Sequence, residues 1–424
     1  MTTTSLPTTT HPAPLALGIT GWPTRVPRFD RVYPGPKDVL RVPITSGQAT
    51  GAPGGSLRKV AQVTLFDGRS AQAREGTAGT LPSLAADGQA KVMLDEPPEA
   101  IPAGDLSQWI DRLADGEVCA NRRGSPDLLA QLHSALRRPI DTVVCSILDS
   151  DPAACVQSAI AATHPTDLIA GVTLLGRICG AARTWIALDG ASPSNWWPTL
   201  RAEARKAQVR IVELVNDYPQ ADPTLLLYSL TGRRLRPGRL PAELGVLVID
   251  AAAAVAVGAA ALRGARGSRQ YLVIRDHDHS ESYFVDAPAG MSAGQVLAAA
   301  NLPGTGGVSS STNRPRVLRG GDVLRDQRLT PDAVVGGGSE LVLHVSTAAP
   351  PVNPDPCIRC AWCFESCPTR IQPANLLEAS QHRDMHQAER AGLAACIECG
   401  ICTYVCPSGL PILSGIRALR KNER

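Results

Sequence analysis

The chain has 424 residues, which is enough for roughly two to four domains with hydrophobic cores of their own. Its 42 basic and 39 acidic residues leave a net charge of +3 with no long basic run, a balance that argues against nucleic acid as a partner. Most of its 12 cysteines are gathered near the C-terminus, and the others are scattered among small or apolar neighbours, as inert buried thiols are.

The first part of the chain has two distinct compositions. Residues 1–30 begin with a Thr- and Pro-rich stretch that lacks the basic and apolar regions of a secretion signal, so we expect a disordered leader and a cytoplasmic protein. Residues 31–97 are rich in glycine and contain short, largely apolar pieces between turn residues, at 39–42, 60–66 and 91–94. This pattern predicts a small all-β module.

Residues 98–266 alternate between apolar strands and helical segments. We expect strands at 140–147, 184–188 and 209–215, and helices at 165–179 and 197–207. Strands that alternate with helices favour a parallel, doubly wound sheet. The predicted fold class is therefore α/β, in a chain of several domains.

Residues 244–262 are almost entirely apolar, and about 20 such residues suffice to cross a bilayer. Asp250 lies within this stretch, however, and a carboxylate at membrane depth is costly. The stretch divides better into a buried strand at 245–249 and a helix of small residues at 251–263. We expect no direct membrane span, so any membrane attachment should come through a partner.

Residues 267–347 return to β character, from a strand at 271–275 to a strand at 340–344, with one helix at 293–300. The last domain, residues 348–424, begins with a proline-rich linker at 350–356. In that domain we expect a helix at 374–395 and a shorter one at 410–421.

Two cysteine runs in this last domain both read C-x2-C-x2-C-x3-C-P. This is the bacterial ferredoxin pattern, in which the fourth cysteine of each run ligates the other cluster. Structural zinc is the alternative, but zinc sites take their cysteines in two pairs. We therefore predict two [4Fe–4S] clusters that carry electrons. Cluster 1 takes Cys357, Cys360, Cys363 and Cys406, and cluster 2 takes Cys396, Cys399, Cys402 and Cys367.

Over about residues 38–421, the domain order and several motifs resemble the C subunit of the Rnf electron-transport complex. The match is strongest in CIRCAWCFESCP and CIECGICTYVCPSGLPIL. Shorter matches are Tyr218-Pro219-Gln220, Leu230-Thr231-Gly232-Arg233 and the acidic turn Asp149-x-Asp151-Pro152. The resemblance implies a β barrel-sandwich module (31–97), a Rossmann-like flavin and NADH domain (98–266), a β-grasp domain of the SLBB type (267–347) and a two-cluster ferredoxin domain (348–424).

The loops that bind flavin and NADH in this family are altered here. The family's G-x-G-G-A-G-F-P loop, whose backbone approaches the phosphates, corresponds to residues 119–126, where only Gly124 and Pro126 keep their places. The family's Asn-Val-Gly-Thr loop becomes 250–253, which begins with a carboxylate, and its Gly-Gly-Pro-Met loop becomes 320–323. These changes disfavour FMN. The residues of this degenerate site are Cys119, Asn121, Arg122, Arg123, Gly124, Asp149, Asp151 and Asp250.

The resemblance implies a peripheral protein on the cytoplasmic side of the inner membrane, with membrane subunits of a redox complex and ferredoxin or another iron–sulfur protein as partners. Intact cysteine runs beside an altered glycine loop favour a relay of single electrons without an NADH or FMN site, so no catalytic residue is assigned. Two alternatives share the cluster motifs. One is a catalytic NADH dehydrogenase subunit with FMN, and the other is a corrinoid (cobalamin) reductase with the same domain order.

Overall fold

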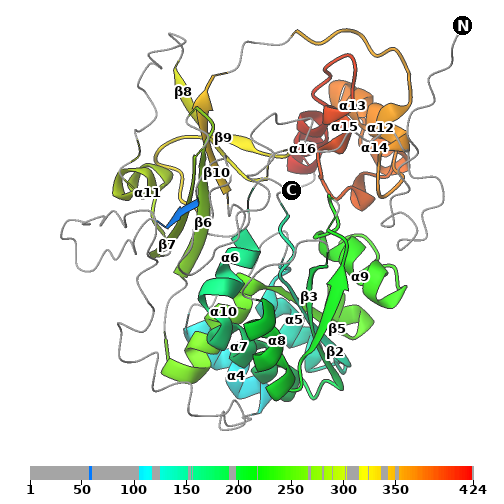
Figure 1. Ribbon diagram of the computed structural model, residues 1–424. Helices are drawn as coiled ribbons and strands as arrows, with labels where there is room; N and C mark the ends of the chain where they lie inside the picture. Colours follow the sequence, from blue (N-terminus) through cyan, green and yellow to red (C-terminus); the bar gives the residue numbers. More distant parts are fainter. Residues whose placement is uncertain are drawn as a thin grey trace, which may run out of the picture. The chain divides into compact units, whose positions relative to one another are not determined.

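The computed structural model describes residues 57–59, 105–116, 125–150, 154, 156–190, 197–216, 218–265, 269–278, 281–288, 290–300, 302, 315–322, 324–335, 342–348 and 353–422. These residues divide into two compact units, drawn in Figure 1. The C-terminal unit comprises 224–239 and 353–422, and the core unit comprises the other described residues. The predicted leader at 1–30 and nearly all of the predicted β module at 31–97 lie outside the described residues.

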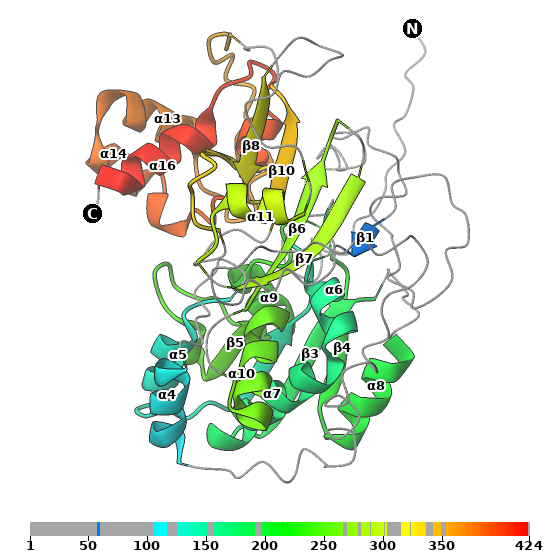
Figure 2. The ribbon, with the colours of Figure 1, turned by 90° about the vertical axis from the view of Figure 1, so that its left-hand side faces the viewer.

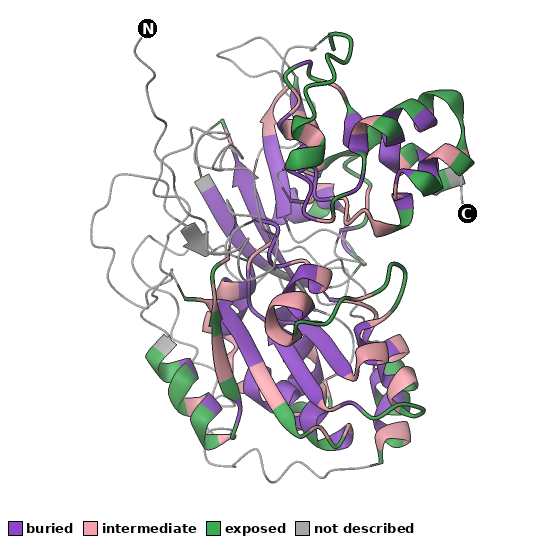
Figure 3. Cartoon of the chain, turned by 90° about the vertical axis from the view of Figure 1, so that its right-hand side faces the viewer, coloured by how far each residue is buried: buried purple, intermediate pink, exposed green. Residues whose placement is uncertain are grey.

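The core unit contains a four-stranded parallel sheet in the order β4-β3-β2-β5. Strands β2 and β5 are buried along their whole length, because the sheet is covered on both faces and takes apolar residues on both. Figure 3 shows this burial along the strands. The predicted α/β class is confirmed, and the four strands predicted within residues 98–266 are all present. They are β2 (Thr142–Ser146), β3 (Arg183–Asp189), β4 (Arg210–Leu214) and β5 (Val246–Asp250).

One layer of helices packs beside this sheet (Figure 2), formed by α6 (Val156–Thr163), α7 (Pro165–Ile178), α8 (Trp197–Lys206) and α10 (Ala251–Arg263). The strand and the helix expected within 244–262 are therefore both present, as β5 and α10. Among the described residues, no helix is long and apolar enough to cross a membrane.

Two further helices precede β2, namely α4 (Leu106–Asp115) and α5 (Leu128–Ala135). The side chain of Gln131 on α5 pairs with the backbone of Val248 on β5: its Nε2 donates to the carbonyl at 2.9 Å, and its Oε1 accepts from the amide at 3.0 Å. Gln131 is completely buried. Because β5 ends the sheet, this amide group stands in for a neighbouring strand at the edge of the sheet.

The core unit also holds a six-stranded sheet in the order β1-β7-β6-β10-β8-β9. Strand β10 runs parallel to β6 and antiparallel to β8, and α11 (Ala293–Ala299) packs on the sheet through Val296 and Leu297. The β-grasp assignment of this region stays a prediction. The strands are β1 (Leu57–Lys59), β6 (Arg269–Asp276), β7 (Glu281–Pro288), β8 (Arg316–Gly320), β9 (Gln327–Leu329) and β10 (Val342–Thr347).

The C-terminal unit is helical, and one prediction for it was wrong. The single helix expected at 374–395 is broken into three pieces, because Arg383 adopts a left-handed conformation (φ 55°) and Asp384 caps a new helix by accepting from the Gln387 amide. The helices are α9 (Pro223–Thr231), α12 (Trp362–Glu365), α13 (Pro373–His382), α14 (Met385–Arg390), η5 (Leu393–Ala395), α15 (Ile401–Tyr404) and α16 (Ile412–Asn422).

Candidate functional site

The two cysteine runs follow the same backbone path. In each run, the residue before the second cysteine is left-handed, namely Arg359 (φ 53°) and Glu398 (φ 49°). The residue after the second cysteine is left-handed too, namely Ala361 (φ 64°) and Gly400 (φ 82°). A short helix then carries the third cysteine of each run, in α12 and α15. The sequence repeat is therefore also a structural repeat.

Backbone hydrogen bonds place the end of each run beside the start of the other. After the second run, Ser408 accepts through its carbonyl from the amide of Asp355 at 2.9 Å, and its Oγ donates to the carbonyl of Pro356 at 3.0 Å. After the first run, the amide of Gln372 donates to the carbonyl of Ala391 at 3.0 Å. This exchange brings the last cysteine of each run towards the other loop.

Several thiol groups interact across the two cysteine runs. Cys367, the last cysteine of the first run, interacts electrostatically with Cys396, Cys399 and Cys402. Cys363 interacts in the same way with Cys360, with Cys406, the last cysteine of the second run, and also with Cys402. These interactions link thiols of both runs, and the division of the eight cysteines between two clusters stays a prediction.

The chemistry of these thiols fits a metal cluster. Burial raises the pKa of Cys396 to about 11 and that of Cys402 to about 12, so a thiolate there needs compensating positive charge, such as a bound metal would supply. Backbone amides already point at the sulfurs: the amide of Glu398 donates to Cys396 Sγ at 3.3 Å. Within the described residues, which include all eight of these cysteines, no group of three or more His, Cys, Asp or Glu is placed to hold a metal ion.

The predicted flavin and NADH loop is described only in part, because Cys119, Asn121, Arg122, Arg123, Gly124 and Asp151 lie outside the described residues. Asp149 is described, and its carboxylate accepts from the Gln157 amide and from Ser158 Oγ, both at 2.6 Å. These donors belong to the first turn of α6 and favour the charged carboxylate, whereas burial raises the pKa of Asp149 to about 7. The local role of Asp149 is to cap a helix.

Asp250 is the residue before α10, at the position where the resemblance predicts the family's flavin loop. Its Oδ1 accepts from the Ala253 amide at 2.8 Å, and it is only 2% exposed. The side chain of Gln157 completes the arrangement, since its Oε1 accepts from the Ala251 amide at 3.0 Å and its Nε2 lies 3.4 Å from Asp250 Oδ2. Two amides of the first turn are thus already bonded, and a carboxylate lies where a phosphate would need positive charge. The described residues do not fit a flavin phosphate here.

A small cavity of about 20 Å³ lies nearby, beyond the ends of β2 and β4, with room for about one water molecule. Arg325, from the loop after β8, lines it and pairs with Asp322, and Ser150 Oγ donates to Asp322 Oδ1 at 2.9 Å. Asp322, in the altered loop, therefore links the loop after β8 to the loop after β2 through a polar contact. Neither Arg325 nor Gln157 stands in a recognisable motif, so no sequence signal marks their roles. The other lining residues are Asp149, Asn216, Tyr218, Pro219, Gln220, Ala221 and Asp222.

Two family models match this chain. The Nuo51 FMN-binding domain matches residues 128–259, which include the parallel sheet and most of α10. The 4Fe-4S dicluster domain matches residues 349–407, which include both cysteine runs. The matched sheet and the matched cysteine loops are thus the two regions described above.

Among characterised proteins, the chain is 24% identical over 253 residues to the C subunit of the Na(+)-translocating ferredoxin:NAD(+) oxidoreductase complex of Acetobacterium woodii. That match covers 59% of this chain and 56% of the relative. The C subunit of the ion-translocating oxidoreductase complex of Edwardsiella ictaluri is 25% identical, with 59% of this chain and 31% of the relative covered. The chain thus spans about half or less of the length of these relatives. Cobalamin reductase PduS of Citrobacter freundii is 26% identical, with 73% and 70% covered.

A solved structure of an NAD+-reducing [NiFe]-hydrogenase in the H2-reduced state has a similar fold, with a TM-score of 0.51 at 16% identity. The superposition covers 78% of this chain and 64% of that chain. At this identity the likeness concerns the fold alone. The resemblance predicted from the sequence is confirmed by the relatives: this chain is similar to the C subunits of Rnf-type ion-translocating oxidoreductases, with a Nuo51 FMN-binding domain followed by a 4Fe-4S dicluster domain.

Proposed function

We propose that this chain is a peripheral iron–sulfur subunit of an Rnf-like membrane redox complex and relays single electrons through two [4Fe–4S] clusters. Its partners are the membrane subunits of that complex, on the cytoplasmic side of the membrane, and ferredoxin or another iron–sulfur protein. A one-electron donor reduces one cluster by one electron, the second cluster receives that electron, and a one-electron acceptor removes it. No bond is formed or broken, and no proton is required.

The observation that carries the proposal is the pairing of the two cysteine runs. Cys367 lies among the thiols of the second run, and Cys406 interacts with a thiol of the first run. Contact between the two runs supports two cubanes that each take three cysteines from one run and one from the other. The predicted ligands are Cys357, Cys360, Cys363 and Cys406 for cluster 1, and Cys396, Cys399, Cys402 and Cys367 for cluster 2.

We further propose that the Nuo51-type domain of this chain holds no FMN and does not oxidise NADH. Hydride transfer needs the nicotinamide beside the flavin, with the phosphates held by backbone donors. The first turn of α10 instead bonds to Asp250 and Gln157, and the Asp250 carboxylate repels a phosphate. The domain then serves as a scaffold that carries the ferredoxin domain.

The direct test is to quantify iron, acid-labile sulfide and FMN in protein purified without oxygen. We expect about eight irons per chain and no stoichiometric FMN. A content of about two zinc ions per chain, one for every four of these cysteines, with no iron would overturn the cluster proposal. A matching assay follows NADH-dependent reduction of ferricyanide with added FMN, and turnover at the rate of an ordinary dehydrogenase would restore the catalytic NADH alternative.

A corrinoid reductase is the second candidate, because the match to the cobalamin reductase PduS covers more of both chains than the Rnf-type matches do. In that case one electron from a reduced cluster converts cob(II)alamin to cob(I)alamin. The distinguishing experiment mixes the dithionite-reduced, desalted protein with cob(II)alamin and follows the cob(I)alamin absorbance. Stoichiometric and rapid formation of cob(I)alamin would favour the reductase over the relay function.

A further inference from the structure

The two cysteine loops share a backbone path, and one of the equivalent positions at which their residues differ carries opposite charges. The left-handed residue before the second cysteine is Arg359 in the first loop and Glu398 in the second. Arg359 is exposed, and its neighbour Ile358 is 67% exposed. The side chain of Glu398 is only 13% exposed, because it is covered by the last helix of the chain, α16.

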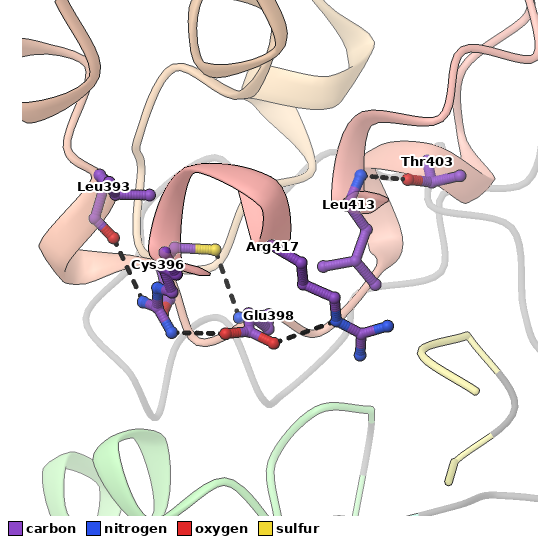
Figure 4. A network of polar contacts seen from close by, with 7 residues as sticks. Leu393, Cys396, Glu398, Thr403, Leu413 and Arg417 are labelled. Carbon is purple, nitrogen blue, oxygen red and sulfur yellow. Dashed lines mark hydrogen bonds and ion pairs between the residues drawn. The ribbon is translucent and has the colours of Figure 1, made fainter. Parts of the chain in front are cut away.

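Glu398 holds two arginines of α16 against its own loop. Its Oε1 accepts from Arg420 Nη1 at 2.6 Å, and its Oε2 accepts from Arg417 Nε at 3.2 Å. Figure 4 shows Glu398 with Arg417 on one side and the Leu393 and Cys396 segment on the other. The second nitrogen of Arg420 donates to the carbonyl of Cys396 at 2.5 Å and to that of Leu393 at 3.2 Å. The guanidinium group of Arg420 therefore holds the backbone at Cys396 and at Leu393, three residues earlier.

The position of α16 is set independently of these charges. Ile412, Ile416 and Leu419 recur along one face of the helix and are buried in the C-terminal core. The Leu413 amide also donates to Thr403 Oγ1 at 2.8 Å, which ties the start of α16 to α15. An anchored helix presents its arginines at a defined place, so little side-chain and backbone freedom is lost when the contacts form.

We propose that Arg420 and Arg417, oriented by Glu398, are positioning residues for the cluster assigned to Cys396, Cys399, Cys402 and Cys367. They hold the Cys396 loop in its ligating geometry, and the guanidinium charge of Arg420 stabilises the reduced, more negative cluster. The inference rests on the proposed function, since it assumes that these cysteines ligate a cluster. The equivalent residue of the first loop, Arg359, is exposed, so these arginine contacts act on cluster 2 alone.

Two charge-changing variants test this inference on the full chain, purified without oxygen and titrated potentiometrically by electron paramagnetic resonance. Arg420→Met removes positive charge and two backbone hydrogen bonds, so the reduction potential of cluster 2 should fall, and a chelator should remove cluster 2 roughly tenfold faster. Glu398→Gln removes negative charge and keeps one of the two acceptor oxygens, at the loss of one arginine hydrogen bond, so the potential of cluster 2 should rise. Cluster 1 should keep its potential in both variants.

The matched control is Lys421→Met, which removes a positive charge from an exposed position next to Arg420 on the same helix. Arg420→Lys keeps the positive charge but has one terminal nitrogen instead of two. Cluster 2 should therefore keep the wild-type potential and still be removed quickly by the chelator. Equal potentials in Arg420→Met and Lys421→Met, or shifts of the same sign in Arg420→Met and Glu398→Gln, would contradict the proposal. A wild-type protein without cluster signals would instead overturn the proposed function, and with it this inference.

Discussion

In this protein, single buried side chains form hydrogen bonds with backbone groups that would otherwise need a neighbouring strand or a ligand as partner. Gln131 pairs with the edge strand β5, and Gln157 with Asp250 bonds to the first turn of α10. Each is at most 6% exposed, so an unpaired backbone group beside it would lack water as a partner. Around β5 and α10, the backbone groups of the α/β sheet are thus bonded from within the chain.

At this scale, the crossed ligation of the clusters gives a first prediction. Cys367→Ala should abolish the signal of cluster 2 and leave that of cluster 1, because Cys367 lies among the thiols of the second run. Cys406→Ala is the matched variant and should do the reverse. Electron paramagnetic resonance of the reduced proteins separates the two signals, and loss confined to cluster 1 in Cys367→Ala would rule out the crossed assignment.

A buried pair of histidines gives a second prediction. His277 Nε2 donates to His344 Nδ1 at 2.9 Å, and His344 Nε2 donates to the Gly321 carbonyl at 2.9 Å. Burial lowers the pKa of His277 to about 4 and that of His344 to about 3. The unfolded chain therefore binds more protons than the folded one between about pH 6.5 and pH 4, and stability falls as the pH falls through that window.

Urea denaturation between pH 7.5 and pH 4.5 measures this dependence, whose slope is at most ~1.4 kcal/mol per pH unit for each proton taken up. His344→Gln should lower stability at pH 7.5 and flatten the slope, because one of the two protonation sites is gone. An unchanged slope in the variant would show that the histidine pair does not cause the acid sensitivity. The wild-type protein at high salt is a useful control, since buried groups are screened little.

At the scale of elements, the tightest contact is the crossing of α7 and α10. A Cβ built on Gly171 would lie 1.9 Å from the Ala254 carbonyl oxygen, and one on Gly258 would lie 1.9 Å from the Asp167 carbonyl oxygen. Arg263 then closes the end of α10 on Asp167 with two hydrogen bonds, at 2.6 and 2.7 Å. Small residues in 251–263 are therefore a packing requirement of two helices and not a membrane signal.

This contact predicts that Gly171→Ala or Gly258→Ala destabilises the core unit by roughly 2–4 kcal/mol, because backbone atoms must move apart and the core loosens. Gly176→Ala on the same helix is the control, since its Cβ would meet only the Thr184 side chain, at 2.6 Å, which can rotate. Denaturant midpoints of the three variants make the comparison. Similar losses in all three would point to general strain instead of the crossing, since helix propensity favours alanine over glycine at each position.

At the scale of the whole molecule, the two units differ in what stabilises them. The core unit has two sheets and a large apolar core, whereas the C-terminal unit has a small core that includes Cys367 and Cys402 themselves. Small domains with few buried apolar residues depend on metals or disulfides for stability. If the proposed clusters bind, their ligands come together only in the folded arrangement, so cluster binding would contribute directly to folding.

Removal of the clusters with a chelator under mild oxidation should therefore unfold the C-terminal unit and leave the core unit folded. We expect circular dichroism to lose part of its helical signal, while the thermal transition of the core unit stays within a few degrees. Hydrogen exchange resolves the units: peptides from 373–422 should lose protection and peptides from 142–188 should keep it. Retained protection in 373–422 would show that the apolar core alone holds this unit.

The features that could be predicted from the amino-acid order are local in origin. Alternation of apolar segments indicated the four parallel strands, and Asp250 within an apolar stretch separated β5 from α10. The cysteine spacing indicated the paired runs, because two intervening residues direct successive thiols to one site. The break of the 374–395 helix was missed, although Asp384 is a good cap, because the helical periodicity continues on both sides of it.

Contacts between residues far apart in the chain could be known only from the folded molecule. The partners of Gln131 on β5 and of Gln157 at α10 are 117 and 94 positions away, and no local pattern marks either glutamine. The same holds for Arg420, which reaches the Cys396 carbonyl from 24 positions away because α16 folds back on the loop. The spacing of residues in the sequence determines which side chains lie on one face of a segment. Tertiary packing determines which distant group becomes the hydrogen-bond partner of each buried polar group.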